Sequence, residues 1–333
     1  MSLKVTAAAH PNLALVKYWG NADDALNIPM NNSISVNLSA ATTTTSVTFD
    51  AALSADRVTI DGREAGGAAY DRVVRHLDRV RRLADIEARA VVESRNDFPA
   101  SAGIASSASA FAALSLAASR AAGLDLDAPA LSRLARRGSG SACRSIPDGW
   151  AEWLAGGSDE TSYAVQIAPP EHWDLRITTV IFDAPPKDIG STEGHRLAHT
   201  SPFYAARQAA LPATLDAVRR GLLARDFHAM GMAAEREAVS LHVIAMTSPV
   251  PDRPHLSGIY YWGPGTMRVI QACQVWRRDG LDVYFTIDAG ANVHLLCEAA
   301  SQPALEAELS RLLAEIGGRI LVSAPGRGAW LFD

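Results

Sequence analysis

The sequence contains very little lysine. Among its 31 basic side chains, lysine occurs only at Lys4, Lys17 and Lys187, and the others are arginines. A general preference for arginine on solvated surfaces accounts for such a bias. Arginine, however, is a planar fork that never loses its charge, whereas lysine is a compact point charge on a flexible stem. A lysine that remains in such a sequence can therefore mark a place that arginine cannot fill.

Cysteine is also scarce, and long apolar runs are absent. Cys143, Cys273 and Cys297 form no CxxC pair, which favours free thiols in a reducing compartment. No stretch reaches the roughly 18 apolar residues that span a bilayer, and residues 1–6 lack the apolar core of a signal peptide. The net charge of −5 argues against a broad nucleic-acid surface. We expect a soluble, cytoplasmic protein that binds neither nucleic acid nor membranes.

The apolar periodicity predicts a mixture of strands and helices over a chain long enough for two domains. Predicted strands cover residues 3–9, 13–17, 33–38, 43–49, 88–93, 175–182, 282–287, 292–297, 319–323 and 328–332. Predicted helices cover residues 70–84, 106–121, 127–137, 202–223, 226–243, 265–278 and 302–316. Because these elements lack a regular βαβ rhythm, the pattern favours the α+β class. Proline pairs at 169–170 and 185–186 favour a boundary between domains at 1–183 and 184–333.

The segment 99–109 places a glycine-containing loop before a helix of very small residues. Free N–H groups and the dipole at a helix N-terminus attract anions, and serine hydroxyls add donors. The Gly-Lys-Ser/Thr of a Walker A loop is missing. The segment therefore predicts either a polyphosphate site or a tightly packed Ala/Ser helix.

Three other segments carry polar groups that are typical of a site. The turn at 136–145 ends in Arg144 and can surround an oxyanion, although it can equally be a helix end and linker. Asp288 directly follows an apolar strand and is either a base or the start of a turn. Lys17 ends an apolar strand beside two aromatic residues, where it can meet phosphate, tune a carboxylate or extend to water.

The region after the second proline pair is ambiguous. Lys187 precedes Gly-Ser-Thr-Glu at 190–193, which can cap a helix or contact phosphate. His195 and His199 are four residues apart, but no HExxH glutamate and no third ligand accompany them. We expect two surface imidazoles there rather than a metal site.

Taken together and in order, these segments resemble the mevalonate diphosphate decarboxylase family, within the superfamily of galactokinase, homoserine kinase and mevalonate kinase. The resemblance covers nearly the whole chain. It rests on ALVKYWG at 14–20, NNSIS at 31–35, GIASSA at 103–108, GSGSACRS at 138–145, STEG at 191–194, TSPFY at 200–204 and IDAG at 287–290.

The resemblance implies a fold and a reaction. The fold would join a ribosomal-protein-S5-like N-terminal domain, which binds the nucleotide, to a ferredoxin-like C-terminal domain, with the active site in the cleft between them. The reaction would be an ATP-dependent decarboxylation with Mg²⁺, in which the tertiary 3-hydroxyl is phosphorylated, phosphate leaves as CO₂ is lost, and an alkene forms. A homodimer is also implied.

Roles for individual residues follow from the same resemblance. Asp288 would orient or deprotonate the 3-hydroxyl, Lys17 would keep Asp288 ionised, and Arg144 would hold the substrate carboxylate or 5-phosphate. Further substrate contacts are implied for Asn12, Tyr18, Asn21, Arg72, Ser139, Ser141 and Ser191. ATP contacts are implied for Ser101, Gly103, Ala105, Ser106 and Ser107, with Ser107 also a ligand of Mg²⁺.

The chain departs from the family pattern in three places. Family members that use the diphosphate usually carry a lysine after Tyr-Trp-Gly, which meets the terminal phosphate, and this chain has Asn21 there. A hydrophobic pair and Gly-Gly normally follow the Arg-Ser at 144–145, where this chain has Ile-Pro-Asp-Gly at 146–149. The usual Gly-Met is Gly-His at 194–195. One missing cation fits a substrate with one fewer phosphate charge.

These departures favour mevalonate 5-phosphate as the substrate and isopentenyl phosphate as the product. Phosphomevalonate decarboxylases, which catalyse that reaction, also share the Ala-His-Pro opening at 9–11 and lack the lysine. The first alternative is a decarboxylase of mevalonate 5-diphosphate that gives isopentenyl diphosphate. The second is a mevalonate 3-kinase, which would release no CO₂. Retention of Asp288, Lys17 and Arg144 together disfavours the kinase and a noncatalytic binding protein.

Overall fold

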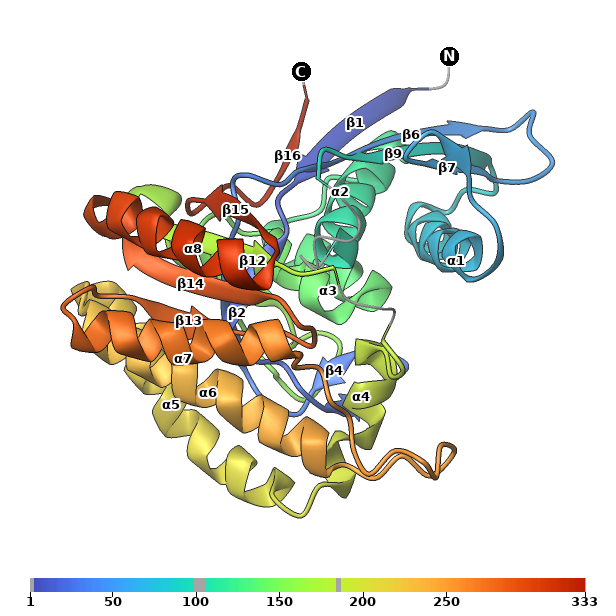
Figure 1. Cartoon of the computed structure of the whole chain (residues 1–333). Helices are drawn as coiled ribbons and strands as arrows, with labels where there is room; N and C mark the ends of the chain where they lie inside the picture. Colours follow the sequence, from blue (N-terminus) through green and yellow to red (C-terminus); the bar gives the residue numbers. More distant parts are fainter. Residues whose placement is uncertain (1–2, 99–105, 184–186, 333) are drawn as a thin grey trace.

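The computed structural model describes residues 3–98, 106–183 and 187–332. These residues form strands and helices in an irregular order, which confirms the α+β class. The strands and helices gather into two halves that meet along a common core (Figure 1). Ser101, Gly103 and Ala105, which were predicted to contact ATP, lie outside the described residues.

A six-stranded sheet and three helices form the outer layer of the first half. The strand order is β16(Ala329–Leu331), β1(Lys4–Ala9), β6(Thr43–Asp50), β9(Arg89–Asn96), β7(Arg57–Ile60) and β8(Arg63–Glu64). Helices α1(Gly67–Ala84), α2(Ser106–Ala121) and α3(Ala128–Gly138) pack against one face. The strand β6 alternates buried and half-buried residues because it lies in the middle of a sheet with one covered face. The two ends of the chain meet where β16 pairs antiparallel with β1 (Figure 1).

A second sheet carries the inner part of the first half. Its order is β11(Ala164–Ala168), β10(Trp150–Trp153), β5(Ser33–Asn37) and β2(Asn12–Val16), all antiparallel. Every residue of β2, β5 and β10 is buried, so these strands are covered on both faces. A short hairpin of β3(Asn21–Asp23) and β4(Ile28–Pro29) follows β2.

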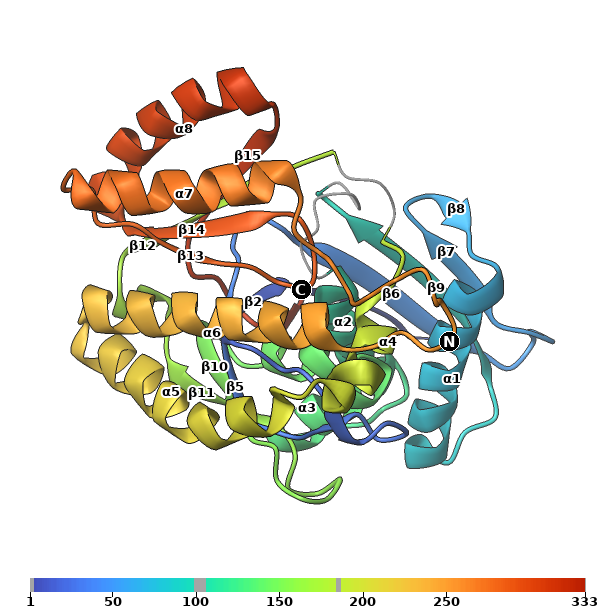
Figure 2. The ribbon, with the colours of Figure 1, turned by 60° about the horizontal axis from the view of Figure 1, so that its bottom comes forward.

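The second half contains a four-stranded antiparallel sheet between two helical layers. The strand order is β13(Tyr284–Thr286), β14(Val293–Glu298), β12(Leu175–Ile181) and β15(Arg319–Ser323). Figure 2 shows α5(Tyr204–Ala224) and α6(Phe227–Thr247) side by side on one side of this half, with α7(Pro264–Arg278) and α8(Gln302–Ile316) on the other. The core residues agree, since α5 and α6 share one cluster with the sheet and α7 and α8 share another.

One hydrophobic cluster crosses between the halves. Leu13 and Leu15 of β2 pack with Leu211 of α5, Met230 of α6 and Leu296 of β14. Because β2 is buried against α5 and α6, the residue that follows it lies beside the second half. This packing places the end of β2 at the junction from which the candidate site is built.

The division into domains at residue 183 stays a prediction, and the sheet pairing argues for an earlier boundary. The strand β12 pairs with β14 and β15, so it belongs to the four-stranded sheet of the second half. We propose a boundary between β11 and β12. The last strand, β16, then returns to the first half.

The long elements agree with the sequence prediction to within a few residues, and several of the short ones were missed. The strands β7, β8, β10 and β11, the hairpin β3–β4 and the helix α4(Ser191–Leu197) had not been predicted. Most of these are too short to show a periodic apolar pattern. Among the described helices, none combines the length and apolarity that crossing a membrane requires.

Candidate active site

An ion pair between Lys17 and Asp288 joins the two halves of the molecule. Lys17 directly follows β2, and Asp288 lies two residues beyond β13. The Lys17 ammonium donates to the Asp288 carboxylate at 2.6 Å and to the carbonyl of Ala14 at 2.6 Å. The lysine side chain is 2% exposed and the aspartate side chain is 31% exposed. The carboxylate therefore faces open space while its partner is enclosed.

Burial and charge set the protonation of this pair. Burial alone would raise the pKa of Asp288, but the charge of Lys17, with those of His294 and Arg144, holds that pKa below its usual value. Burial lowers the pKa of Lys17, and the charges of Asp288 and Glu237 only partly oppose it. Asp288 is therefore an ionised proton acceptor beside an ammonium that loses its proton more easily than a surface lysine does.

Arg144 lies close to this pair and is held rigidly. It belongs to a 3₁₀ turn, η2(Gly140–Ser145). Its Nε donates to the Asn12 side-chain oxygen at 3.1 Å, and its Nη1 donates to the Ser33 hydroxyl at 2.6 Å. The Asn12 amide donates in turn to the Ser145 hydroxyl at 2.8 Å and to the Ser141 carbonyl at 3.0 Å. Asn12 thus fixes Arg144 and the turn together, which leaves the guanidinium preorganised for an anion.

The two serine-rich segments meet at the start of α2. The Ser107 and Ser139 hydroxyls are 3.3 Å apart, so the predicted ATP and substrate segments are adjacent. Arg72 on α1 donates to the Gly138 carbonyl at 3.4 Å. A groove of about 200 Å³ lies between α1, α2 and the outer sheet, and it is lined by Ser106, Ser107 and Arg72, with Val58, Val73, Val92 and Phe111 among its other walls.

Tyr18, Asn21 and Asp24 form a chain of hydrogen bonds at the other end of the site. The Tyr18 hydroxyl donates to the Asn21 side-chain oxygen, and the Asn21 amide donates to the Asp24 carboxylate at 2.7 Å. Tyr18 also lies against Gly140, where an added Cβ would be 2.8 Å from its ring. The chain thus borders the 138–145 turn with one carboxylate, that of Asp24, which the Arg196 guanidinium contacts at 3.8 Å.

His195 is not the surface imidazole that we predicted. It stacks on Tyr18 and Trp19, with ring centroids 4.0 and 4.6 Å away, because α4 packs over the end of β2. Burial, with the charges of Arg207 and Arg144, lowers its pKa to about 3. Its Nδ1 accepts from the Gly20 N–H at 3.0 Å, so the neutral ring carries its proton on Nε2. His199 is exposed, as predicted.

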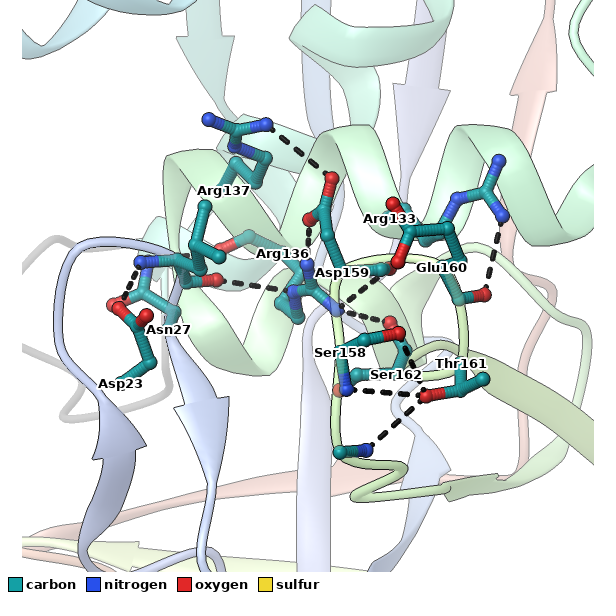
Figure 3. Close-up of polar contacts among 12 residues, drawn as sticks. Asp23, Asn27, Arg133, Arg136, Arg137, Ser158, Asp159, Glu160, Thr161 and Ser162 are labelled. Atoms are coloured by element: carbon teal, nitrogen blue, oxygen red, sulfur yellow. Dashed lines mark hydrogen bonds and ion pairs between the residues drawn. The ribbon is translucent and has the colours of Figure 1, made fainter.

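Arg136 supports the turn and the hairpin from behind. Figure 3 shows its guanidinium between the hairpin and the loop 158–162. Its Nε donates to the Leu26 carbonyl at 3.1 Å, and its other nitrogens contact the Asp159 carboxylate and the Ser162 carbonyl. The Asn27 amide donates back to the Arg136 carbonyl at 3.0 Å. These bonds tie the end of α3, which leads into the 138–145 turn, to the hairpin that begins at Asn21.

Lys187 and Ser191 lie on the approach to the site. The Lys187 ammonium is 5.8 Å from the centre of the Tyr261 ring, and an added Cβ on Gly290 would be 3.6 Å from it. Ser191 is exposed and begins α4. Within the described part of the chain, no three His, Cys, Asp or Glu side chains cluster as metal ligands.

Sequence reasoning missed two groups that touch the site residues. Arg207 and Glu237 form a buried ion pair that contacts the Lys17 peptide group, and Asp24 accepts from Asn21. A charged residue on the apolar face of each long helix, α5 and α6, was the available signal for Arg207 and Glu237. Asp24 gave no signal, because an aspartate in a short polar turn is ordinary.

Two family descriptions cover most of the chain. The Diphosphomevalonate decarboxylase-like N-terminal domain matches residues 9–164, and the Mevalonate 5-diphosphate decarboxylase C-terminal domain matches residues 177–317. The chain belongs to the mevalonate diphosphate decarboxylase family. This finding confirms the resemblance of its motifs, and the protein is therefore an enzyme of the decarboxylase class.

Individual members of the mevalonate diphosphate decarboxylase family agree with this assignment. A phosphomevalonate decarboxylase of Haloferax volcanii is 36% identical, with 88% of each chain covered. The crystal structure of mevalonate diphosphate decarboxylase from Staphylococcus aureus is 36% identical, covers 100% of this chain and 99% of its own, and has a TM-score of 0.94. MDDEF in complex with MVAPP, AMPPCP and magnesium is 38% identical, with full coverage of both chains and a TM-score of 0.92. Likeness over the full length confirms the two-domain fold.

Proposed function

We propose that the protein is an ATP-dependent decarboxylase of mevalonate 5-phosphate, which forms isopentenyl phosphate, CO₂, ADP and phosphate in isoprenoid biosynthesis. The observation that carries the proposal is the convergence of Asp288, Lys17 and Arg144. An ionised carboxylate, an enclosed ammonium and a fixed guanidinium lie together where the halves meet.

Each of these side chains has a distinct part in the proposed reaction. Asp288 accepts or orients the proton of the 3-hydroxyl, and Lys17 keeps that carboxylate ionised. Arg144 holds the substrate carboxylate in place until its carbon–carbon bond breaks. The bonding electrons then form the alkene as phosphate leaves from the neighbouring carbon. Because the site must hold both a hydroxyl and a carboxylate, the three residues together favour decarboxylation over simple phosphorylation.

The groove between α1 and α2 fits a nucleotide. Its apolar walls suit a base, and the hydroxyls of Ser106 and Ser107 lie where α2 begins, so that free N–H groups and the helix dipole face anions. Ser107 also lies beside Ser139 of the substrate turn. We propose Ser107 as a magnesium ligand, since Mg²⁺ needs few protein ligands when phosphates and water complete its shell. When bound, ATP-Mg²⁺ supplies the phosphoryl group that converts the hydroxyl into a leaving group.

The hydrogen bonds of Asn21, whose side chain carries no charge, support a substrate with one phosphate. Both groups of the Asn21 amide are already engaged, by the Tyr18 hydroxyl and by the Asp24 carboxylate. The Nε2 proton of neutral His195 adds a donor but no charge. A terminal phosphate at this end would meet the carboxylate of Asp24, which the exposed guanidinium of Arg196 approaches at 3.8 Å and only partly offsets. We assign the contacts of the 5-phosphate to Tyr18, Ser139 and Ser141.

The alternative substrate is mevalonate 5-diphosphate, and the family likeness favours it. The two solved structures described above are mevalonate diphosphate decarboxylases, and their identities match that of the Haloferax enzyme within two percentage points. Overall identity therefore does not separate the two substrates. The contacts of Asn21 support the monophosphate, because we propose that this residue lies where a terminal phosphate would bind.

The decisive experiment supplies ATP-Mg²⁺ with mevalonate, its 5-phosphate and its 5-diphosphate in separate reactions, and measures ADP and CO₂. We expect equal amounts of both products, with the highest kcat/KM on the 5-phosphate. A much higher kcat/KM on the diphosphate would contradict the substrate assignment. ADP without CO₂ would contradict the decarboxylase. The homodimer implied by the family stays a proposal, which sedimentation of the same preparation tests.

A further inference from the structure

Lys17 lies just beyond the regular pairing of β2. The register between β2 and β5 shifts between Ala14 and Val16, and the strand ends at Val16. The peptide N–H and carbonyl of Lys17 therefore need partners other than a neighbouring strand, because they are buried. The candidate acid–base pair thus depends on a lysine whose backbone the sheet does not hold.

Side chains from two helices of the other half supply those partners. The Lys17 N–H donates to the Glu237 carboxylate at 3.2 Å, and Arg207 donates to the Lys17 carbonyl at 3.0 Å. Arg207 on α5 and Glu237 on α6 also form an ion pair with each other. The Asn31 amide adds a second donor to the same carbonyl at 3.0 Å.

Stability alone does not explain the Arg207–Glu237 pair. Arg207 is 4% exposed and Glu237 is 3% exposed. Removing two charges from water costs about as much as their attraction returns, so a buried pair is a poor source of stability compared with apolar packing. Two of the Arg207 nitrogens, Nε and Nη1, also lack partners within the described residues. What the pair does achieve is a fixed position for one peptide group.

We propose that the Arg207–Glu237 pair is a positioning device for Lys17, which clamps both polar groups of its peptide and so holds its ammonium against Asp288. Neither residue touches the reacting atoms, so both act through Lys17. The consequence for catalysis rests on the function proposed above, but the clamp itself can be tested without turnover.

The pair also acts on the charge of Lys17. The titratable and charged groups that face this ammonium from the surrounding elements are Asp288, Glu237, Arg144, Arg207, His242 and His294. Glu237 stabilises the ammonium, and the positive charge of Arg207, which contacts the Lys17 carbonyl, should oppose it. Removing each one should therefore move the pKa of Lys17 in opposite directions, which a purely structural role would not do.

Because the chain has so few lysines, the pKa of Lys17 can be measured directly. Protein labelled with ¹³C-lysine gives signals from only Lys4, Lys17 and Lys187, and the Lys4→Arg and Lys187→Arg variants assign them. We expect Glu237→Gln to lower the pKa of Lys17 further, because it removes a charge that raises this pKa. We expect Arg207→Met, which leaves the carboxylate uncompensated, to raise it.

Glu152→Gln is the matched control. Glu152 is also a buried glutamate, at 5% exposed, and it pairs with another arginine of α5, Arg219, at 2.7 Å. It accepts from the Asn32 amide at 3.0 Å and has no bond to Lys17 within the described residues. Its loss reproduces the folding cost of a broken helix–sheet ion pair without disturbing the clamp. We expect the titration of Lys17 to be unchanged.

Kinetics provide the second measurement. Glu237→Gln should lower kcat by tenfold or more with little change in KM, and should move the alkaline limb of the pH profile to lower pH. Arg207→Lys keeps a donor and a charge, so it should recover most of the kcat that Arg207→Met loses. An unchanged Lys17 titration in Glu237→Gln, or an equal shift in Glu152→Gln, would overturn the proposal. A wild-type protein that releases no CO₂ would contradict the proposed function, while the lysine titration would still decide the clamp.

Discussion

Adding a cation at position 21 should move the enzyme toward the diphosphate, and the change should be larger when Asp24 is removed as well. In Asn21→Lys, the new ammonium lies within reach of the Asp24 carboxylate, which already accepts from the Asn21 amide at 2.7 Å. The side chain of Asp24 is 51% exposed, and such an exposed pair contributes about 0.2–1 kcal/mol. The lysine would therefore be partly neutralised before it met a phosphate.

The expected size of the change follows from these contacts. A hydrogen bond to a charged group contributes about 1.5–3 kcal/mol, and the half-exposed position of residue 21 favours the lower end. Since about 1.4 kcal/mol is a factor of ten, Asn21→Lys with Asp24→Asn should raise the ratio of kcat/KM for the diphosphate over the monophosphate about tenfold. Competition from Asp24 should limit Asn21→Lys alone to about threefold.

The assay measures CO₂ release from both substrates under the same conditions, in wild type, each single variant and the double variant. Asn21→Met is the control for the lost hydrogen bond from the Tyr18 hydroxyl, because it removes the acceptor without adding charge. A double variant that stays folded and keeps the wild-type ratio within about twofold would refute the role given to Asn21, since a charge added near a phosphate must change how that phosphate is bound.

Three further predictions concern the rest of the site. Asp288→Asn should lower kcat by about 10²–10⁴-fold while calorimetry finds ATP binding nearly intact, and substantial turnover would remove Asp288 from its role. Lys17→Met removes the charge that holds the pKa of Asp288 low, so the acid limb of any remaining activity should move to higher pH; an unmoved limb would contradict the pairing. Arg136→Met leaves the Leu26 and Ser162 carbonyls without this donor, while Asp159 keeps Arg137 at 3.4 Å, and it should cost about 1–3 kcal/mol, seen as a lower Tm. The variant of its half-buried neighbour, Arg133→Met, should change stability by less than about 0.5 kcal/mol.

The sequence identified the site residues better than it identified their contacts. Asp288, Lys17 and Arg144 stand in recognisable segments, and the structure brings them together. Motifs alone could not show that Asn12 holds Arg144, because that contact joins residues 132 positions apart. Arg207 and Glu237 lie in helices that were predicted correctly, yet helical periodicity does not reveal which charged residue is buried or what it meets.

The fold was predictable where elements are long. The helices α2, α5, α6 and α8 show clear ends or periodicity, and their observed bounds differ little from the predicted ones. Pairing was not predictable, since an apolar strand such as β12 suits either sheet. Its partners β14 and β15 lie more than a hundred residues away, so the choice depends on tertiary packing that local pattern does not carry.

The chemistry around Lys17 explains why an arginine-rich chain keeps a lysine there. The ammonium has two acceptors, the Ala14 carbonyl and the Asp288 carboxylate, each at 2.6 Å. A guanidinium would bring five N–H donors into this enclosed space, and those without acceptors would each carry the cost of an unsatisfied buried group. Arg144 and Arg207 already contribute positive charge nearby. A lysine leaves fewer donors unsatisfied, and it also limits the accumulation of positive charge, because its pKa can fall under burial while a guanidinium stays charged. Compactness and tunable charge are therefore needed at the same place, and of the three lysines only Lys17 is both enclosed and paired with Asp288.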